Sequence, residues 1–302
     1  MALPNADTML AVTRLTPDVS TRNRTLFGRV RSVHRAAIYV DLPEPGGLLV
    51  IAIDDVGGVP GGLLVDRVTD LRRIGVRPGM TFVPTAAGWA IPSAGVGIET
   101  SRAITWSPAL PPAALLDPTP KLARALAVAR RLASDSAPDD GLATPRPDEA
   151  WVVRAWTLIG NQRQALVAGD LVAAVGPTVE LIGLGVGLTP SGDDYLVGLL
   201  AGFAALGDPV GIELGDAVAE HASVRTTAIG ASALAHASRG AFAERLHDVL
   251  VALAGGRFAD LATSIDRSTA YGATSGSDTL VGLFEGIDTA VARRGAGTSV
   301  AA

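Results

Sequence analysis

Two short stretches hold most of the residues whose types and spacing could do chemistry. The first, residues 183–203, reads GLGVGLTPSGDDYLVGLLAGF and places two adjacent carboxylates, Asp193 and Asp194, after a run of glycines and hydroxyls. Glycine lets the backbone take positive φ and approach a ligand closely, and an ionised carboxylate only accepts hydrogen bonds. We predict a loop that turns into a helix N-terminus, with both aspartates in the first turn, where the helix dipole favours negative charge.

Two positions for the start of this helix stay open. Ser191 could be the N-cap, with Asp194 three residues later completing a capping arrangement. Thr189 could serve equally well, with Pro190 at the first helical position. Capping alone would explain Ser191 and Asp194, whereas Asp193 is not needed for a cap and is therefore the stronger candidate for a binding or catalytic site.

The same phrase occurs a second time, at residues 275–287. SGSDTLVGLFEGI repeats SGDDYLVGLLAGF of residues 191–203, with 8 of 13 positions identical. In each copy two glycines lie four residues apart on one helical face, where another backbone could pack closely. These glycines are Gly198, Gly202, Gly282 and Gly286. We therefore predict that the two helices pack together and bring their N-termini near one cleft.

Three ligand chemistries suit such a pair of helix starts. Loop and helix N–H groups could bind a phosphate, a Mg²⁺ could bridge carboxylate and phosphate, or the carboxylates could accept hydrogen bonds from a carbamoyl or amide NH2. Between the two copies, Arg225 precedes Thr226 and Thr227 at a predicted helix start. An arginine flanked by hydroxyls suits an oxyanion. Arg239 is a weaker candidate, because it could simply compensate a helix C-terminus.

Composition argues against several classes of site. The chain has no cysteine, which removes thiolate nucleophiles, disulfides and cysteine-ligated metals. Lys121 is the only lysine and stands in a plain helical pattern, which argues against a P-loop or Schiff-base lysine. The four histidines lack the spacing of a zinc site. A net charge of −5 argues against a nucleic-acid partner.

The elements that must position these residues fall into two parts. From residue 25 to about 106, short aliphatic runs broken by glycine and proline predict six or seven strands, hence a small barrel or sandwich. After a proline-rich boundary the apolar period becomes helical, and both motifs belong to that part. The fold class is thus α+β, a β-rich N-terminal part followed by an all-helical C-terminal domain.

The predicted domain limits follow from this division. We expect a flexible tail at 1–22, a β-rich domain at 23–110, a proline-rich linker, helix and loop at 111–150, a helical domain at 151–295, and a tail at 296–302. Within the helical part, one helix is expected to end at Gly176-Pro177. The first twenty residues do not read as a signal peptide, and the longest apolar stretch is too short to span a bilayer, so a soluble cytoplasmic protein is expected.

Residues 180–290 also resemble a known family. The phrase GLGVGLTPSGDDYLVGLLAG, the helix with Thr226, Ser232 and Gly240, and the closing GATSGSDTLVGLFEGI are similar to the AllH family, associated with a subunit of oxamate carbamoyltransferase. The N-terminal half resembles it only in its strand-rich layout and an SVHRA segment. The resemblance implies an enzyme assembly in purine (allantoin) catabolism. There, oxalurate and phosphate are exchanged with oxamate and carbamoyl phosphate, and partner subunits are required.

Carbamoyl transfer needs an oxyanion stabiliser, a phosphate cradle and an oriented acceptor. We expect the Gly185 to Gly192 loop to hold the phosphate or carbonyl oxygen, the carboxylates to hold the carbamoyl or amide NH2 or a Mg²⁺, and Arg225 to meet the acceptor carboxylate. The expected catalytic residues are Asp193, Asp194, Asp278 and Arg225. The expected substrate- and phosphate-binding residues are Gly185, Gly187, Thr189, Ser191, Gly192, Thr226, Thr227, Ser275 and Gly276. No cofactor is required, and Mg²⁺ is the one candidate.

Two alternatives from other classes remain. The low charge and high apolar content also suit a non-catalytic subunit whose glycine-faced helices dock partner chains. A Mg²⁺-dependent phosphohydrolase, or another phosphate-ester enzyme, would use the carboxylates directly and need no partner protein. The expected partners are carbamoyl phosphate, an oxamate-like acceptor and other subunits of a hetero-oligomer, without nucleic acid or membrane.

Overall fold

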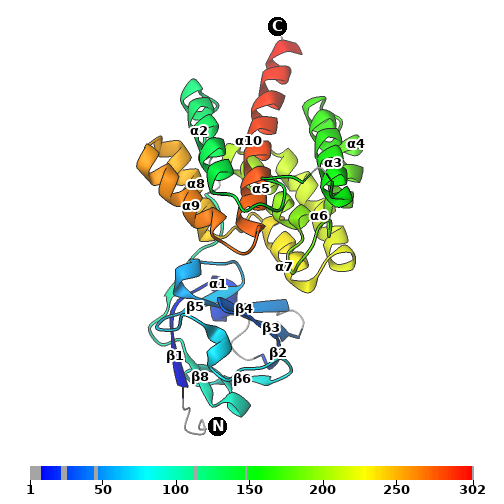
Figure 1. The fold of residues 1–302 in the computed structure, drawn as a ribbon. Coiled ribbons are helices and arrows are strands. Elements are labelled where there is room, and N and C mark those ends of the chain that lie inside the picture. Colours follow the sequence, from blue (N-terminus) through cyan, green and yellow to red (C-terminus); the bar gives the residue numbers. More distant parts are fainter. Residues whose placement is uncertain (1–7, 22–25, 44–46, 112–113, 147, 301–302) are drawn as a thin grey trace. The chain divides into compact units, whose positions relative to one another are not determined.

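The computed structural model describes residues 8–21, 26–43, 47–111, 114–146 and 148–300, with side chains up to residue 296. The chain divides into two compact units, Met1–Pro108 and Ala109–Ala302. The first is built of strands and the second of helices (Figure 1). The predicted fold class, a small β-rich domain followed by an all-helical one, is confirmed.

Eight strands of the first unit close into a barrel, in the order β1-β5-β4-β3-β2-β6-β7-β8 and back to β1, and β9 adds to β1. Side chains alternate between inside and outside, as in β3, where Ile38, Val40 and Leu42 are buried, because successive residues of a strand face opposite sides. The strands are β1 (Thr8–Leu15), β2 (Gly28–Val33), β3 (Ala37–Leu42), β4 (Gly47–Ile53), β5 (Gly62–Val65), β6 (Thr81–Thr85), β7 (Gly88–Ile91), β8 (Val96–Glu99) and β9 (Ile104–Thr105).

The N-terminal segment differs from its prediction. Where a flexible tail is expected at 1–22, residues 8–21 form β1 and a short helix, α1 (Pro17–Thr21); the remainder of that tail lies outside the described residues. Strand β1 pairs with β5 on one side and with β8 on the other. It therefore closes the barrel, a role that depends on strands far along the chain and leaves little local signal in the sequence.

The second unit is a bundle around two central helices, α5 (Ser191–Leu206) and α10 (Ser275–Val300). In Figure 1, α2, α8 and α9 lie on one side of this pair and α3, α4 and α6 on the other. The surrounding helices are α2 (Pro120–Ser136), α3 (Ala150–Val167), α4 (Leu171–Leu181), α6 (Val210–Arg225), α7 (Ala228–Ala237), α8 (Glu244–Gly255) and α9 (Phe258–Thr269). Fourteen of the sixteen residues of α5 are buried, which explains its apolar sequence on all sides.

Two helix ends are corrected. Helix α4 continues through Gly176-Pro177 to Leu181, because its last turn packs in the core. There the hydroxyl of Thr178 accepts a hydrogen bond from Gln162 (2.7 Å), which in turn accepts one from the Tyr195 hydroxyl (3.1 Å). Helix α10 extends to Val300, where a tail is expected from residue 296. Within the described residues, no helix has the length and apolar character needed to cross a membrane.

Candidate functional site

Helices α5 and α10 touch backbone to backbone through their glycines. A methyl group at Gly198 would lie 1.9 Å from the carbonyl oxygen of Thr279, and one at Gly282 would lie 1.9 Å from that of Tyr195. Both distances are far inside van der Waals contact, so only glycine fits at either position. The predicted packing of the two motif helices is therefore confirmed.

The two helices run parallel, because Tyr195 meets Gly282 while Leu199, one turn further on, meets Gly286. Their N-termini consequently lie at the same end of the pair. Two parallel helix dipoles place two partial positive charges side by side, and an acidic residue in each first turn offsets this repulsion. Asp194 and Asp278 occupy those first turns and are buried.

The loops that lead into the two helices are also equivalent. The amide of Gly192 donates to the carbonyl of Leu184 (2.8 Å), and the amide of Gly276 donates to that of Tyr271 (3.0 Å). A methyl group would strike the chain at either glycine. The first-turn amides of Gly192 and Gly276, two of the residues predicted to bind phosphate, are thus already hydrogen-bonded within each motif.

Neither predicted cap of α5 is correct. Pro190 is the N-cap residue and has no polar side chain with which to cap the helix. Its carbonyl accepts from the amides of Asp193 (2.8 Å) and Asp194 (3.2 Å). The hydroxyl of Ser191 is thereby left for another partner. It favours the charged form of Asp278 in the other motif.

The serine hydroxyl of each motif acts on the aspartate of the other motif, which we call the crosswise arrangement. Ser191 of the first motif favours the charged form of Asp278. Ser275 of the second motif, together with Thr189, favours the charged form of Asp194. The hydroxyls of Thr189 and Ser275 are themselves 2.8 Å apart. The two copies therefore form one hydrogen-bonded cluster, which a single motif could not build.

Burial within this cluster raises the pKa of both aspartates. Burial raises the pKa of Asp194 well above its ordinary value, and the negative charge of Asp278 adds to the rise. Burial likewise raises the pKa of Asp278, against the hydrogen bonds that favour its charged form. Each residue also has one buried oxygen, Oδ2, that accepts no hydrogen bond from the described part of the chain. A donor-rich ligand group would suit these two oxygens.

Arg245, a residue that sequence reasoning missed, supplies positive charge to the cluster. Its charge acts on Asp194 and lowers the pKa of that carboxyl, opposing the effect of burial. The guanidinium lies over the ring of Tyr271, 3.6 Å from the ring centre. Its Nη1 atom is buried and has no hydrogen-bond acceptor among the described residues. A negative or carbonyl oxygen beside Asp194 would satisfy it.

Asp193 is used differently from its neighbour. Its Oδ1 accepts from the amide of Gly183 (2.8 Å), and its Oδ2 accepts from the hydroxyl of Thr226. Gly230 leaves room for the carboxylate, since a methyl group there would lie 2.1 Å from Oδ2. Both oxygens are thus occupied within the protein, and Asp193 ties the loop before α5 to the start of α7. Burial raises its pKa to about 6.

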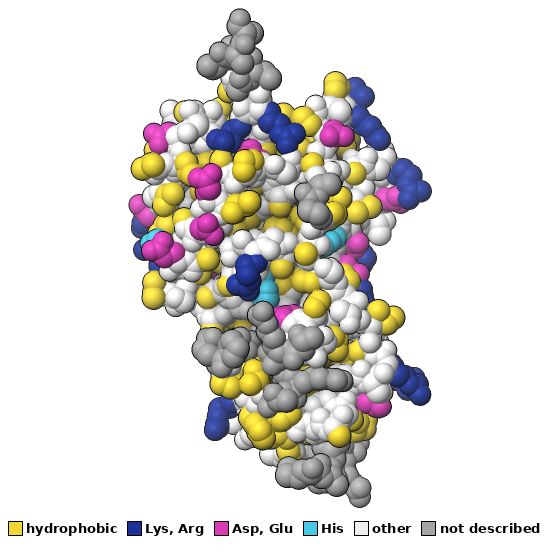
Figure 2. Space-filling model, turned by 180° about the vertical axis from the view of Figure 1, so that it is seen from behind, with side chains coloured by type: hydrophobic (Ala, Val, Ile, Leu, Met, Phe, Trp, Pro, Cys, Tyr) yellow, Lys and Arg dark blue, Asp and Glu magenta, His cyan; other side chains and the backbone are white. Residues whose placement is uncertain are grey.

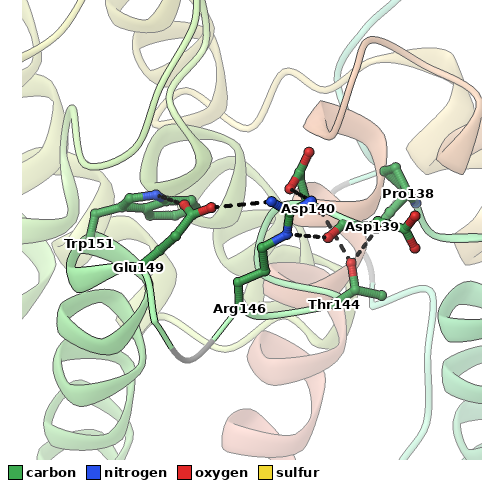
Figure 3. Close-up of polar contacts among 7 residues, drawn as sticks. All are labelled: Pro138, Asp139, Asp140, Thr144, Arg146, Glu149 and Trp151. Atoms are coloured by element: carbon green, nitrogen blue, oxygen red, sulfur yellow. Dashed lines mark hydrogen bonds and ion pairs between the residues drawn. The ribbon is translucent and has the colours of Figure 1, made fainter.

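The loop between α2 and α3 contacts Asp278. The amide of Leu142 donates to Asp278 Oδ1 at 2.6 Å. Figure 3 shows how this loop is braced: the Arg146 guanidinium lies 2.8 Å from Asp140 and donates to the Asp139 carbonyl. The loop thereby fixes one oxygen of Asp278, while Oδ2 accepts no hydrogen bond from the part of the chain that the structure describes. The sequence predicts only that this segment is a loop, and it could not show the contact with Asp278, which lies 136 residues away.

Arg225, Thr226 and Thr227 stand near the first loop but not at a shared helix start. Arg225 is the exposed last residue of α6, and α7 begins after its N-cap Thr227. The hydroxyl of Thr227 donates to the carbonyl of Leu188. Gly185 and Gly187 take φ values of 115° and 97° in the same loop, as their predicted turn requires. Their ligand-binding roles stay predictions, as does a cleft between the two N-termini.

The described residues contain no group of three or more His, Cys, Asp or Glu side chains that could hold a metal ion. Asp194 and Asp278 would supply at most two carboxylates. The cluster also contains hydroxyls and one guanidinium. These donors suit an oxyanion, and the carboxylate oxygens suit an NH2 group, so the cluster fits such a ligand better than a bare cation. Mg²⁺ as a cofactor remains a prediction.

Comparison with known proteins points to this same part of the chain. Residues 181–287 match the AllH family. The family is described as oxamate carbamoyltransferase subunit AllH, and the resemblance expected from the sequence is confirmed over that range. The AllH-matching region contains both motifs and Arg245, but neither the barrel nor the Leu142 loop. No curated protein and no solved structure matches the chain.

Proposed function

We propose that this chain is a subunit of a carbamoyltransferase and that the crosswise cluster of α5 and α10 binds the carbamoyl group. The observation that carries the proposal is a pair of buried carboxylates beside Arg245. Among the described residues, the Oδ2 atom of each carboxylate and the Nη1 atom of Arg245 have no hydrogen-bond partner. Asp194 and Asp278 accept hydrogen bonds from the carbamoyl NH2. Arg245 binds the carbonyl or phosphate oxygen. The match of residues 181–287 to a subunit of oxamate carbamoyltransferase supports this substrate class.

The reaction requires no covalent intermediate with the enzyme. The acceptor amide nitrogen forms a bond to the carbamoyl carbon, and the bond from that carbon to the phosphate oxygen breaks. Phosphate leaves with the electron pair, and the proton lost by the acceptor nitrogen ends on the phosphate. Asp194, whose pKa burial raises well above its ordinary value, can carry this proton. The proposal includes oxamate as the acceptor and further subunits that complete the enzyme. It places the complex in the cytoplasm and the reaction in purine catabolism.

The first test is thermal stabilisation of the full-length chain by carbamoyl phosphate, with phosphate and Mg²⁺ added separately. A ligand at 100 times its dissociation constant adds about 2.7 kcal/mol. We expect stabilisation in the wild type and its loss in Asp194→Asn and Asp278→Asn. The matched control is Asp216→Asn, which removes an exposed carboxylate of α6. Unrelated effects of the first two substitutions would contradict a paired site.

Arginine substitutions test which arginine binds carbamoyl phosphate. Arg245→Met should weaken carbamoyl phosphate binding by roughly tenfold or more, the value of a charge-assisted hydrogen bond. Arg225→Met tests the sequence-based expectation that this exposed residue binds the acceptor, and should leave carbamoyl phosphate binding nearly unchanged. A large effect of Arg225→Met with none from Arg245→Met would move the site to the first loop.

A second candidate function is a non-catalytic docking subunit. Large apolar side chains are exposed on the helical unit, among them Val172 (87%), Val224 (82%) and Ile212 (67%), and Figure 2 shows hydrophobic side chains interspersed with charged ones of both signs on one face. This alternative predicts that a folded wild-type chain gains no stability from any of the three ligands.

A further inference from the structure

A cavity with mostly apolar walls and a few polar side chains lies beside the cluster. It has a volume of about 200 Å³, is partly open to solvent and is lined by α2, the 142–145 loop, α3 and α10. Its walls include an aromatic ring, Trp156, and two side chains of opposite charge, Arg130 and Glu285. This volume is suited to a small molecule of a few non-hydrogen atoms rather than to a peptide.

Each of the two charged side chains has an ion-pair partner outside the cavity. Arg130 pairs with Asp288 at 2.8 Å and lies over the ring of Phe284, 5.6 Å from its centre. Glu285 pairs with Arg163 at 3.2 Å. Neither Asp288 nor Arg163 lines the cavity. An occupant would therefore meet one fixed cation and one fixed anion, an arrangement that complements a short molecule with a carboxylate at one end and N–H donors at the other.

The cavity shares residues with the carboxylate cluster. Leu142 lines the cavity, and its amide donates to Asp278 Oδ1 at 2.6 Å. Ser277, also in the cavity wall, directly precedes Asp278 in the chain. A molecule in the cavity would thus lie next to the segment that holds one of the two proposed carbamoyl-binding carboxylates.

We propose that this cavity is the acceptor subsite and that it takes a short amide carboxylate. Arg130 binds the carboxylate, and Glu285 accepts hydrogen bonds from the amide NH2. The inference rests on the proposed function, because it names the acceptor position for the same reaction. It assigns acceptor recognition to Arg130, where the sequence alone suggested Arg225.

The test is calorimetric titration of the full-length chain with oxamate, which carries both groups. Acetamide lacks the carboxylate and oxalate lacks the amide, so both should bind at least about tenfold more weakly. Arg130→Met should weaken oxamate binding by about tenfold or more, and Arg130→Lys by less. Arg131→Met, which changes the exposed neighbour on α2, is the matched control and should have no effect.

Ser134→Phe provides a second variant that does not disturb the ion pair of Arg130. Ser134 lines the cavity and is exposed, so a phenylalanine there should fill the cavity, abolish oxamate binding and leave the thermal midpoint unchanged. Oxamate binding that is equal in wild type, Arg130→Met and Ser134→Phe would overturn the proposal, as would its absence in the wild type.

Carbamoyl phosphate separates this proposal from the proposed function. If carbamoyl phosphate stabilises the chain through Asp194 and Asp278 while oxamate binding ignores Arg130, the acceptor subsite is wrong and the carbamoyl site stands. If oxamate binds through Arg130 and carbamoyl phosphate gives no stabilisation, the cavity recognises an amide carboxylate but the cluster does not bind the carbamoyl group.

Discussion

The two motif copies share one aspartate, one serine and three glycine positions but differ by one carboxylate in the first helical turn. The first copy has Asp193 where the second has Ser277. The shared aspartates, Asp194 and Asp278, each have one oxygen that accepts no hydrogen bond from the described residues. Asp193, in contrast, has both oxygens occupied by Gly183 and Thr226. The repeated carboxylates are therefore available to a ligand, and the unrepeated Asp193 is built into the fold.

The structure thus exchanges the roles expected for Asp193 and for the two repeated aspartates. Asp193 stands out in the sequence because a helix cap does not need it, yet its burial between the loop and α7 explains it. Asp194 and Asp278 look like ordinary first-turn residues, yet they form one cluster across two helices. Substitutions at Asp193 should therefore change the stability of the fold, and substitutions of the repeated pair should change ligand binding.

The largest effect is expected from separating the two copies. Gly198→Ala would place a methyl group 1.9 Å from the Thr279 carbonyl oxygen, so the helices must move apart. We expect a loss of roughly 3 kcal/mol or more in the free energy of unfolding, at the upper end of the cost of overpacking a core, measured by chemical denaturation. The control is Gly160→Ala in α3, where a methyl group meets nothing within 4 Å. It should stabilise by up to about 1 kcal/mol.

A cost of Gly198→Ala no larger than that of an ordinary surface substitution would mean that α5 and α10 are not held in backbone contact. The crosswise cluster would then lose its basis, because Ser191 reaches Asp278 only across this interface.

The pH dependence of the free energy of unfolding tests whether Asp193 is buried in the fold. Burial raises its pKa from 3.8 to about 6, so the folded chain holds the proton where the unfolded chain has released it. The resulting stability is present below about pH 4 and is lost as the pH rises through 6. At about 1.4 kcal/mol for each pH unit between the two pKa values, the loss is about 3 kcal/mol.

Asp193→Asn cannot ionise and should lack this loss. Comparing the free energies of unfolding of wild type and variant between pH 4 and 7 isolates Asp193, since Asp194 and Asp278 remain in both. In the same experiment, carbamoyl phosphate binding should persist in Asp193→Asn. Identical pH profiles for the two chains would mean that Asp193 is ionised or solvated in the folded state.

The smallest effect tests the crosswise exchange of hydroxyls. Ser191→Ala and Ser275→Ala each remove a hydroxyl that favours the charged form of the aspartate of the opposite motif, and the loss of such a polar interaction should cost about 1 kcal/mol. Each loss should also raise the pKa of the opposite aspartate further, because the hydroxyl favours the charged form. Denaturation and carboxyl titration by NMR would measure both. A pKa change confined to the aspartate of the substituted motif would contradict the crosswise arrangement.

Much of the architecture could be predicted from local sequence signals. The alternation of aliphatic residues identified the β-rich part, and the recurrence of SGxD with glycines four apart identified two helices that pack together. The barrel-closing strand β1 was missed because its pairing partners lie elsewhere in the chain. The helix through Pro177 was missed because burial of Thr178 against Gln162 outweighs the unfavourable propensity of proline.

The sequence by itself determined which residues could pair: two equivalent helices, two first-turn aspartates and glycines that permit backbone contact. Only the tertiary structure decided how these residues are used. Parallel packing brings Asp194 and Asp278 to the same end, and folding adds Arg245 from α8 and the Leu142 amide from a distant loop. Burial and Coulomb repulsion, which set the pKa of these carboxyls, depend on distances that no local pattern encodes.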